Sequence, residues 1–329
     1  MTNIYSYFFD SLVGYNVKPN CLNSNIKYSV SNMINCSIFD IYAGREMCYT
    51  VFGGGLMKQK LSQLSSPALA GVINKQSTAG AVSAIKNSTV AGADMIDLHL
   101  SCLENTDEAS LKTIIHSTRL PVLALNYNKT LAGEDAGYAT EEERVESLLR
   151  AVRAGAAGID MQGYTFHRPS KSGFFGEDNY SFTKGEPKEV VTDENVIAKQ
   201  CELIEQVHAM GAEVLLSCHP GIPMTCDRVV ELALFLEKRK PDILKIVTVA
   251  KTEDDLLESI RTMTVLKKEI QTPITYLATG KAGSLSRIIN PLLGAHIAFC
   301  VEHYEDQMFV GQPDLRSMRT IVDTAQRNL

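Results

Sequence analysis

From residue 67 onward, hydrophobic positions follow two alternating patterns that predict strands and helices in regular succession. Short continuous apolar runs bounded by turn residues are typical of buried strands, whereas apolar positions three or four residues apart are typical of helices. The predicted strands cover residues 67–73, 94–100, 121–127, 158–162, 214–219, 242–248, 274–279 and 296–301. The predicted helices cover residues 79–91, 108–117, 140–154, 194–210, 224–240, 252–268, 284–293 and 314–326.

Eight strand–helix repeats predict an α/β fold in which the strands close into a (β/α)8 TIM barrel over residues 67–329. An open, doubly wound sheet is the alternative, but the even number of strands and the absence of a glycine-rich first turn argue against it. The helix over 140–154 has a capping-box start, because Thr140 is followed three residues later by Glu143.

Residues 1–66 have a different pattern and are predicted to form a separate N-terminal extension of short strands. Apolar and polar residues alternate over 35–42 and 46–52, and three glycines follow at 53–55. Alternation of period two beside a turn signal predicts a β-hairpin-type arrangement. The glycines favour a turn over a phosphate loop, because no Lys-Ser/Thr pair follows them. We expect this extension to cap the amino-terminal mouth of the barrel or to form an oligomer contact.

The composition excludes several classes of partner. A net charge of −6 gives no reason to expect binding to nucleic acid or to an anionic membrane. The eight cysteines form no CxxC pair, and neither a signal peptide nor a transmembrane stretch is apparent. These features predict a cytoplasmic protein with reduced cysteines that acts on a small molecule.

Two polar residues lie in adjacent predicted strands, Lys245 inside the strand at 242–248 and His219 at the end of the strand at 214–219. A helix connects these strands, so they are expected to be parallel neighbours with both side chains at the same mouth of the barrel. Lysine is rarely buried without a partner, and a desolvated amine can form a Schiff base with a ketone. A neighbouring histidine can transfer protons near neutral pH. A lysine that extends out of the sheet is the structural alternative.

Other polar residues lie toward the ends of predicted strands and are expected to line the same pocket. They are Asp97, His99, Tyr127, Asp160 and Gln162. The loop after the strand at 274–279 places glycines, Ser286 and Arg287 at the start of a helix. Backbone N–H groups, a helix N-terminus and an arginine predict an anion site, although a tight turn with a surface arginine is the alternative.

Four segments resemble the type I 3-dehydroquinate dehydratases, in the same order and with compatible spacing. They are residues 217–219 (Ser-Cys-His), 242–247 (Asp-Ile-Leu-Lys-Ile-Val), 280–287 (Gly-Lys-Ala-Gly-Ser-Leu-Ser-Arg) and 311–312 (Gly-Gln). The resemblance covers the chain from residue 67 onward. It implies a homodimeric Schiff-base lyase of the shikimate pathway and aromatic amino acid biosynthesis, which needs no metal or dissociable cofactor.

The resemblance also implies roles for individual residues. Lys245 matches the lysine that forms the imine, and His219 matches the general acid/base. Arg287 and Gln312 match residues that hold the substrate carboxylate, and we place Ser286 of the same motif with them among the substrate-binding residues.

The sequence departs from the family where the substrate hydroxyls bind. The Glu-x-Arg pair of the second strand reads Asp97-Leu-His99, and the arginine that ends the third strand reads Tyr127, or Asn126 if the alignment shifts by one. The family's Glu-Gly-Gly is not clear in residues 130–135, and a serine near the end reads Met308. Each lost charged hydrogen bond costs roughly 1.5–3 kcal/mol, enough to change the substrate.

We therefore predict an imine-forming lyase that acts on a carboxylated ketone, with Asp97, His99 and Tyr127 on the rebuilt side of the pocket, and leave the substrate open. A class I aldolase, with phosphate in the loop at 280–287, is the first alternative. A metal-dependent barrel enzyme that uses Asp97, His99, Asp160 and His219 is the second, and a non-catalytic ligand-binding barrel is the third. The long loop at 163–193 is expected to be a lid whose aromatic residues close over the substrate. Its candidates are Tyr164, Phe166, Phe174 and Phe175.

Overall fold

The computed structural model describes residues 37–39, 48–52, 55–57, 59–127, 140–167, 189–304 and 311–327. The chain divides into two compact units, Met1–Leu56 and Met57–Leu329. In a three-stranded sheet near the N-terminus, β1 (Ser37–Phe39) pairs antiparallel with β2 (Cys48–Phe52), and β3 (Gly55–Met57) is the third strand. Strands β1 and β2 lie within the alternating stretches of the sequence. The predicted domain boundary at residue 66 stays a prediction.

Eight parallel strands form a nearly closed barrel, which confirms the predicted fold class. In chain order they are β4 (Ala68–Ile73), β5 (Met95–His99), β6 (Val122–Leu125), β7 (Gly158–Gln162), β8 (Glu213–Cys218), β9 (Ile243–Val249), β10 (Ile274–Thr279) and β11 (Ile297–Cys300). Hydrogen-bonded neighbours run β10-β9-β8-β7-β6-β5-β4-β11. Between the end strands β10 and β11, the His296 amide donates to the Ile274 carbonyl at 2.9 Å and the Ile297 amide to the Thr275 hydroxyl at 2.9 Å.

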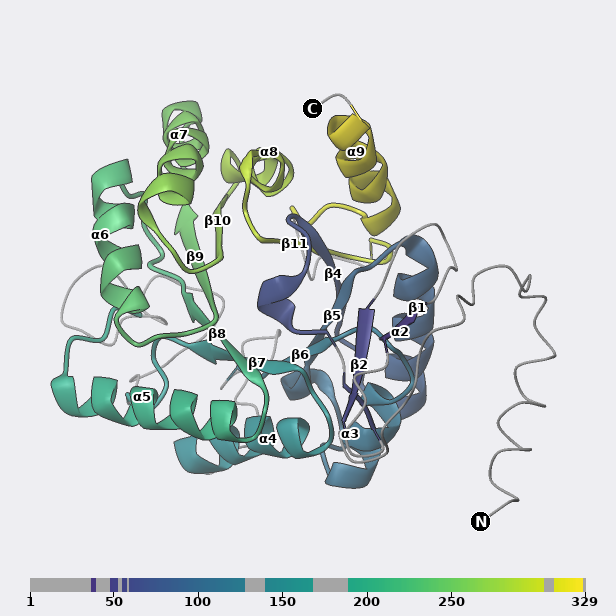
Figure 1. The fold of residues 1–329 in the computed structure, drawn as a ribbon. Helices are drawn as coiled ribbons and strands as arrows, with labels where there is room; N and C mark the ends of the chain where they lie inside the picture. Colours follow the sequence, from purple (N-terminus) through teal and green to yellow (C-terminus); the bar gives the residue numbers. More distant parts are fainter. Residues whose placement is uncertain are drawn as a thin grey trace, which may run out of the picture. The chain divides into compact units, whose positions relative to one another are not determined.

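The helices that follow the strands lie around the outside of the barrel (Figure 1). They are α2 (Thr78–Ala91), α3 (Glu108–Ile115), α4 (Glu141–Arg153), α5 (Glu194–Ala209), α6 (Cys226–Glu237), α7 (Glu253–Glu269), α8 (Ser286–Leu293) and α9 (Leu315–Arg327). The predicted capping box forms at α4, where Thr140 and Glu143 each bind the other's backbone N–H. None of the helices in the described ranges has the length and hydropathy that a bilayer-spanning segment needs.

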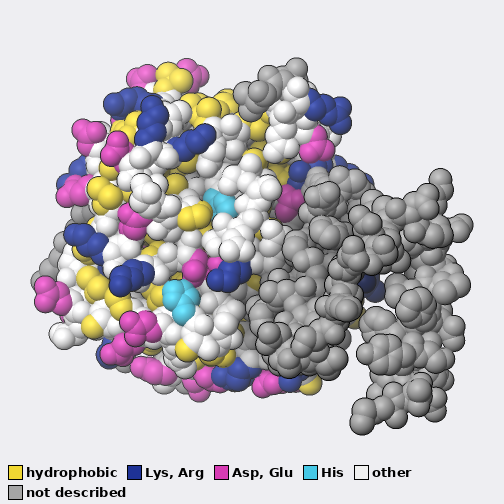
Figure 2. All heavy atoms as spheres, viewed as in Figure 1, with side chains coloured by type: hydrophobic (Ala, Val, Ile, Leu, Met, Phe, Trp, Pro, Cys, Tyr) yellow, Lys and Arg dark blue, Asp and Glu magenta, His cyan; other side chains and the backbone are white. Residues whose placement is uncertain are grey.

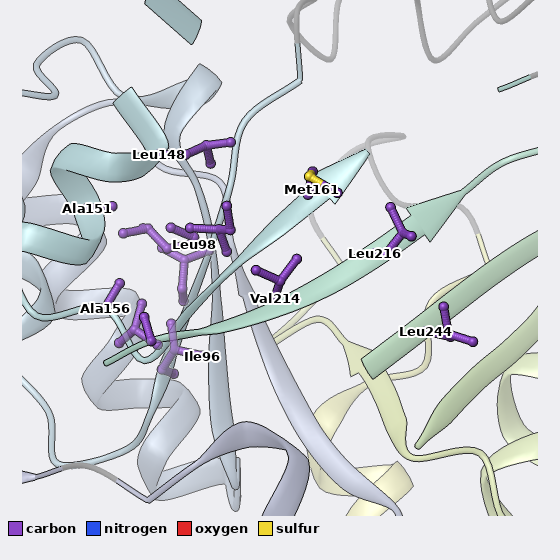
Figure 3. Packing of buried hydrophobic residues seen from close by; sticks show 14 of the residues in the cluster. Ile96, Leu98, Leu148, Ala151, Ala156, Met161, Val214, Leu216 and Leu244 are labelled. Carbon is purple, nitrogen blue, oxygen red and sulfur yellow. The ribbon is translucent and has the colours of Figure 1, made fainter. Parts of the chain in front are cut away.

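Strand side chains alternate between the helix layer and the barrel interior, as the period of two requires. Outward residues pack in one large cluster with the helices, among them Ile96, Leu98, Val214 and Leu216. Figure 3 shows these residues together with Leu148 of α4. The intervening strand positions face the interior, where the polar residues of the site also lie.

The amino-terminal mouth of the barrel is closed by a short 3-10 turn, η2 (Leu61–Gln63). Leu61 is fully buried in the inner apolar cluster with Met95, Leu123 and Ile243. The Ser62 hydroxyl and amide donate to the two carboxylate oxygens of Glu213 at 2.5 and 3.0 Å. The inner cluster therefore forms an apolar floor at the strands' amino ends, away from the mouth where the polar residues gather.

We expect Leu61→Ala to lower the free energy of unfolding by about 2–5 kcal/mol, because it removes a fully buried side chain and leaves a cavity in the floor. Leu257→Ala on α7 is the matched control, since Leu257 is 62% exposed and its loss is expected to cost no more than about 0.5 kcal/mol. Urea unfolding of both variants checks this. Equal effects would show that Leu61 does not support the barrel.

Candidate active site

Lys245 lies inside β9 and points into the barrel, with a side chain that is 8% exposed. Its Nζ lies 3.1 Å from Oδ2 of Asp160 on β7, which is fully buried. The Ser217 hydroxyl donates to the other oxygen of Asp160 at 2.5 Å. Nζ also lies 4.4 Å from the centroid of the Phe299 ring. Lys245 is therefore held inside the pocket by an ion pair and does not extend out of the sheet.

His219 directly follows β8, and its side chain is 13% exposed. Its Nδ1 lies 3.1 Å from Oε2 of Glu189, and its backbone N–H donates to the same oxygen at 2.7 Å. A carboxylate only accepts hydrogen bonds, so Nδ1 carries the hydrogen in the neutral ring and Nε2 is the ring's acceptor. This is the tautomer that a general base requires.

Tyr127 lies between two histidines. Its ring is edge-on to His99 and to His219, with centroids 6.2 Å apart in both pairs. Asn126 faces the helix layer instead, where its amide donates to the Ser147 hydroxyl on α4 at 2.5 Å. Of the two alignments that the sequence left open, the one with Tyr127 places a side chain beside the two histidines.

Asp97 and His99 form a buried pair on β5, with His99 Nε2 3.2 Å from Asp97 Oδ2. Burial disfavours the charged ring, but the Asp97 charge and hydrogen bond, together with Cys102, outweigh it and raise the pKa of His99 to about 9. His99 is therefore a cation at neutral pH. The second oxygen of Asp97 has no hydrogen-bond partner among the described residues.

The predicted anion site brings Arg287 close to the segment that carries Gln312, because a Cβ added to Gly311 would lie 3.8 Å from Arg287 Nε. Burial lowers the pKa of Arg287 to about 10, with Tyr127 acting against this, so the guanidinium stays charged at pH 7. The buried amide oxygen of Gln312 has no partner within the described residues. Arg287 lines a small cavity at the β10–β11 seam together with Thr275, Leu277, Ile297 and Phe299.

Ser286 has a different environment from the one predicted. It is fully buried, its hydroxyl accepts from the Ala278 amide at 2.9 Å, and it donates to the Gly283 carbonyl at 2.7 Å. The hydroxyl hydrogen is thus used within the protein, and this geometry does not support a substrate contact. Ser286 instead secures the loop that places Arg287.

The aromatic residues assigned to a lid do not all lie free of the barrel. Tyr164 is 1% exposed, beneath the guanidinium of Arg144 at 5.2 Å from its ring centroid. Phe166 packs against the outer core. Phe174 and Phe175 lie outside the described residues, as do Met308 and residues 130–135. A lid over the site therefore stays a prediction.

The residue that sequence reasoning missed is Glu189. It lies at the end of an irregular stretch with no periodic pattern, thirty positions before the histidine that it contacts. Asp160 was expected in the pocket, but its ion pair with Lys245 was not. That ion pair depends on the register of three neighbouring strands, in which Gln162 is opposite Ser217 and Ser217 is opposite Lys245, and apolar runs do not specify this register.

Comparisons with known proteins point to one enzyme family. The family model for type I 3-dehydroquinase matches residues 189–328. A curated 3-dehydroquinate dehydratase from Aromatoleum aromaticum is 24% identical over 200 residues, which are 58% of this chain and 76% of the relative. Another, from Desulfotalea psychrophila, is 24% identical over 232 residues, 70% of this chain and 87% of the relative.

Solved structures of such enzymes share the fold. The 3-dehydroquinate dehydratase of Geobacillus kaustophilus superposes with a TM-score of 0.63 at 13% identity, over 82% of this chain and 96% of that one. The type I enzyme of Clostridium difficile, with covalently modified comenic acid, gives 0.62 at 13% identity, over 85% and 99%. At such low identity, this likeness establishes the barrel alone.

Asp97→Asn is expected to lower the pKa of His99 below its ordinary value of about 6.5, because burial then acts without the opposing charge. An NMR pH titration of the His99 ring measures this. Asp94→Asn is the control, since Asp94 pairs with Arg319 at the start of β5. An unchanged His99 titration in Asp97→Asn would contradict the assignment.

The same pair predicts a pH dependence of stability. The folded pKa of about 9 exceeds the unfolded value of about 6.5, so the stabilisation by protonated His99 is complete below pH 6.5 and is lost as the pH rises through 9. When the free energy of unfolding is measured at a series of pH values, the difference between wild type and Asp97→Asn should therefore shrink as the pH rises from about 6.5 to about 9.

Proposed function

Because the chain is a divergent member of the type I 3-dehydroquinase family, we propose that it is a Schiff-base-forming lyase that dehydrates a carboxylated cyclic ketone. The first candidate substrate is 3-dehydroquinate, which the curated relatives are named for. The observation that carries the proposal is a lysine buried in the barrel, paired with Asp160, one strand away from the His219–Glu189 pair.

Lys245 is the proposed nucleophile. Its ammonium must first lose a proton, and Asp160 lies at hydrogen-bond distance to accept it. The amine then attacks the ketone carbon to form a carbinolamine. Its hydroxyl takes the proton back from Asp160 and leaves as water, which gives a protonated imine and restores the Asp160 carboxylate. That positive charge forms beside the Asp160 carboxylate and the Phe299 ring, and both stabilise a cation in a buried site.

His219 is the proposed general acid/base. Its Nε2 takes the proton from the carbon next to the imine, whose electron pair moves toward the iminium nitrogen. The electrons then return to form the carbon–carbon double bond as the carbon–oxygen bond breaks, and the leaving hydroxyl takes a proton from His219 and departs as water. Hydrolysis of the imine restores Lys245.

Arg287 and Gln312 are proposed to hold the carboxylate, because the guanidinium is buried and charged and the amide lies on the segment beside it. On the opposite side, we propose that Asp97, His99 and Tyr127 contact the remaining polar groups of the substrate. An imidazolium offers two donors, whereas a guanidinium offers five. The pattern of substrate hydroxyls can therefore differ from that of 3-dehydroquinate.

The alternatives receive different support. A class I aldolase would use the same lysine, and product analysis separates it from a dehydratase. For the metal alternative, the four candidate ligands are divided among three separate pairs, and no group of three potential ligands occurs among the described residues.

A homodimer and a cytoplasmic location stay predictions. On the face in Figure 2, positive and negative side chains are interspersed over the surface of the barrel unit.

Incubation with 3-dehydroquinate and borohydride should add the reduced substrate to Lys245, as mapped by peptide mass spectrometry, while ultraviolet absorbance reports the conjugated product. Lys245→Met should abolish both signals. His219→Asn should retain trapping but lose about 10²–10⁴-fold in turnover, because general acid–base catalysis contributes that much. Trapping without product would identify a different ketone as substrate, and a panel of carboxylated ketones would follow. Absence of trapping with every ketone would refute the Schiff-base mechanism.

Arg287→Gln should lower kcat/KM by about 10–150-fold, mostly through KM, since a charged hydrogen bond contributes about 1.5–3 kcal/mol. Arg228→Gln is the control, because that arginine is exposed on α6 and pairs with Glu231. Steady-state kinetics measures both. An unchanged KM in Arg287→Gln would show that the carboxylate binds elsewhere.

A further inference from the structure

Glu189 is a buried carboxylate in an unusual backbone conformation. It is fully buried and has a φ of 61°, in the left-handed region that side chains with a Cβ rarely adopt. Such conformations persist where the surrounding structure imposes them, and they concentrate at functional sites.

Packing and hydrogen bonds fix this segment against the ends of β7 and β8. The Glu189 carbonyl accepts from the Cys218 thiol at 3.6 Å, and a Cβ added to Gly163 would lie only 2.8 Å from that carbonyl oxygen. Two residues later, the Val191 carbonyl accepts from buried Arg239 at 3.2 Å. Glu189 therefore cannot shift without displacing buried neighbours.

The side chain of Glu189 is directed at one residue. Oε2 accepts from both the backbone N–H and Nδ1 of His219. Oε1 is buried and has no hydrogen-bond partner among the described residues. Among the described residues, no other donor binds the carboxylate, so its charge acts mainly on His219.

This arrangement differs from the neighbouring Asp97–His99 pair. Asp97 lies two positions from its histidine on the same strand, so regular strand geometry brings the two together. Glu189 comes from the loop before α5, so its contact with His219 depends on the specific conformation of that loop. The end of a strand can form without such a carboxylate. A histidine that becomes charged during proton transfer, in contrast, is stabilised by one.

We propose that Glu189 is a positioning residue that holds His219 in the Nδ1–H tautomer and stabilises the imidazolium formed during proton transfer. This inference rests on the proposed function. When Nε2 takes the substrate proton, the ring becomes positive next to the Glu189 carboxylate. When the proton passes to the leaving hydroxyl, the neutral Nδ1–H tautomer returns without rotation of the ring.

Glu189→Gln and Glu189→Leu test the proposal. Gln keeps an oxygen that can accept from Nδ1 but removes the charge, and Leu removes both. Turnover should fall in the order wild type, Gln, Leu, with Leu losing a large part of the roughly 10²–10⁴-fold contribution of general acid–base catalysis. KM should stay within about threefold, and borohydride trapping on Lys245 should persist. Glu213→Gln is the control, since Glu213 is a buried glutamate at the opposite end of the His219 strand.

Nitrogen-15 NMR of the His219 ring gives a measurement that needs no substrate. Wild type and Glu189→Gln should show the Nδ1–H tautomer in the neutral ring, and Glu189→Leu a mixture of tautomers. A purely structural role would lower the melting temperature of Glu189→Leu but leave tautomer and kcat unchanged, and that result would overturn the proposal. If wild type neither traps nor turns over any ketone, the proposed function fails while the tautomer still decides the role of Glu189.

Gly163→Ala tests position independently of charge. The added Cβ would push the Glu189 backbone away from His219 while the carboxylate remains. We expect reduced kcat with trapping retained and a mixed tautomer. A folded Gly163→Ala protein with wild-type kcat would contradict the requirement for this placement.

Discussion

Charged groups in the interior of the barrel are kept away from water, so each of them needs a partner close by that compensates its charge. Lys245 pairs with Asp160, His99 with Asp97, and His219 with Glu189. Removing one member of a buried pair typically costs about 3–5 kcal/mol, whereas replacing both members by apolar residues is often neutral or stabilising. Buried pairs are thus poor devices for stability alone. Their concentration in one part of the barrel interior is better explained by the chemistry that they make available.

The barrel separates this polar mouth from an apolar floor. Leu61, Met95 and Ile243 pack at the amino ends of the strands, and no charge is needed there. Above them, the same inward positions of the strands carry Lys245, Asp160 and Asp97. Because the floor supplies hydrophobic stabilisation independently, the mouth can keep under-bonded atoms such as Oδ1 of Asp97 and Oε1 of Glu189. The apolar floor of the barrel therefore provides stability, and the polar mouth holds the reactive groups.

This separation explains which features the sequence predicted. Buried strands and amphipathic helices leave local patterns, so the barrel and the pairing of the strands that carry Lys245 and His219 could be predicted from apolar runs. The choice between Tyr127 and Asn126 required the true strand end, which apolar runs define poorly. Ser286 was assigned to the substrate because it precedes Arg287 in the motif that resembles the family. Its actual partners are the backbone of Ala278 and Gly283, and they depend on a loop geometry that the motif does not reveal. Glu189 left no local signal, since its role depends on a contact made only in the folded chain.

The two histidines on either side of Tyr127 have the same kind of partner but suit different tasks. His99 is 4% exposed and is kept charged by Asp97, so it supplies a fixed positive charge to the pocket. A fixed cation can bind a substrate group, but it is a poor base because its proton is held too firmly at neutral pH. His219 is 13% exposed at the rim, where it has access to solvent and the strand of Lys245 is its neighbour. This access suits the proton transfer that we propose for His219. In the proposed mechanism, the difference in burial therefore suits His99 to substrate binding and His219 to proton transfer.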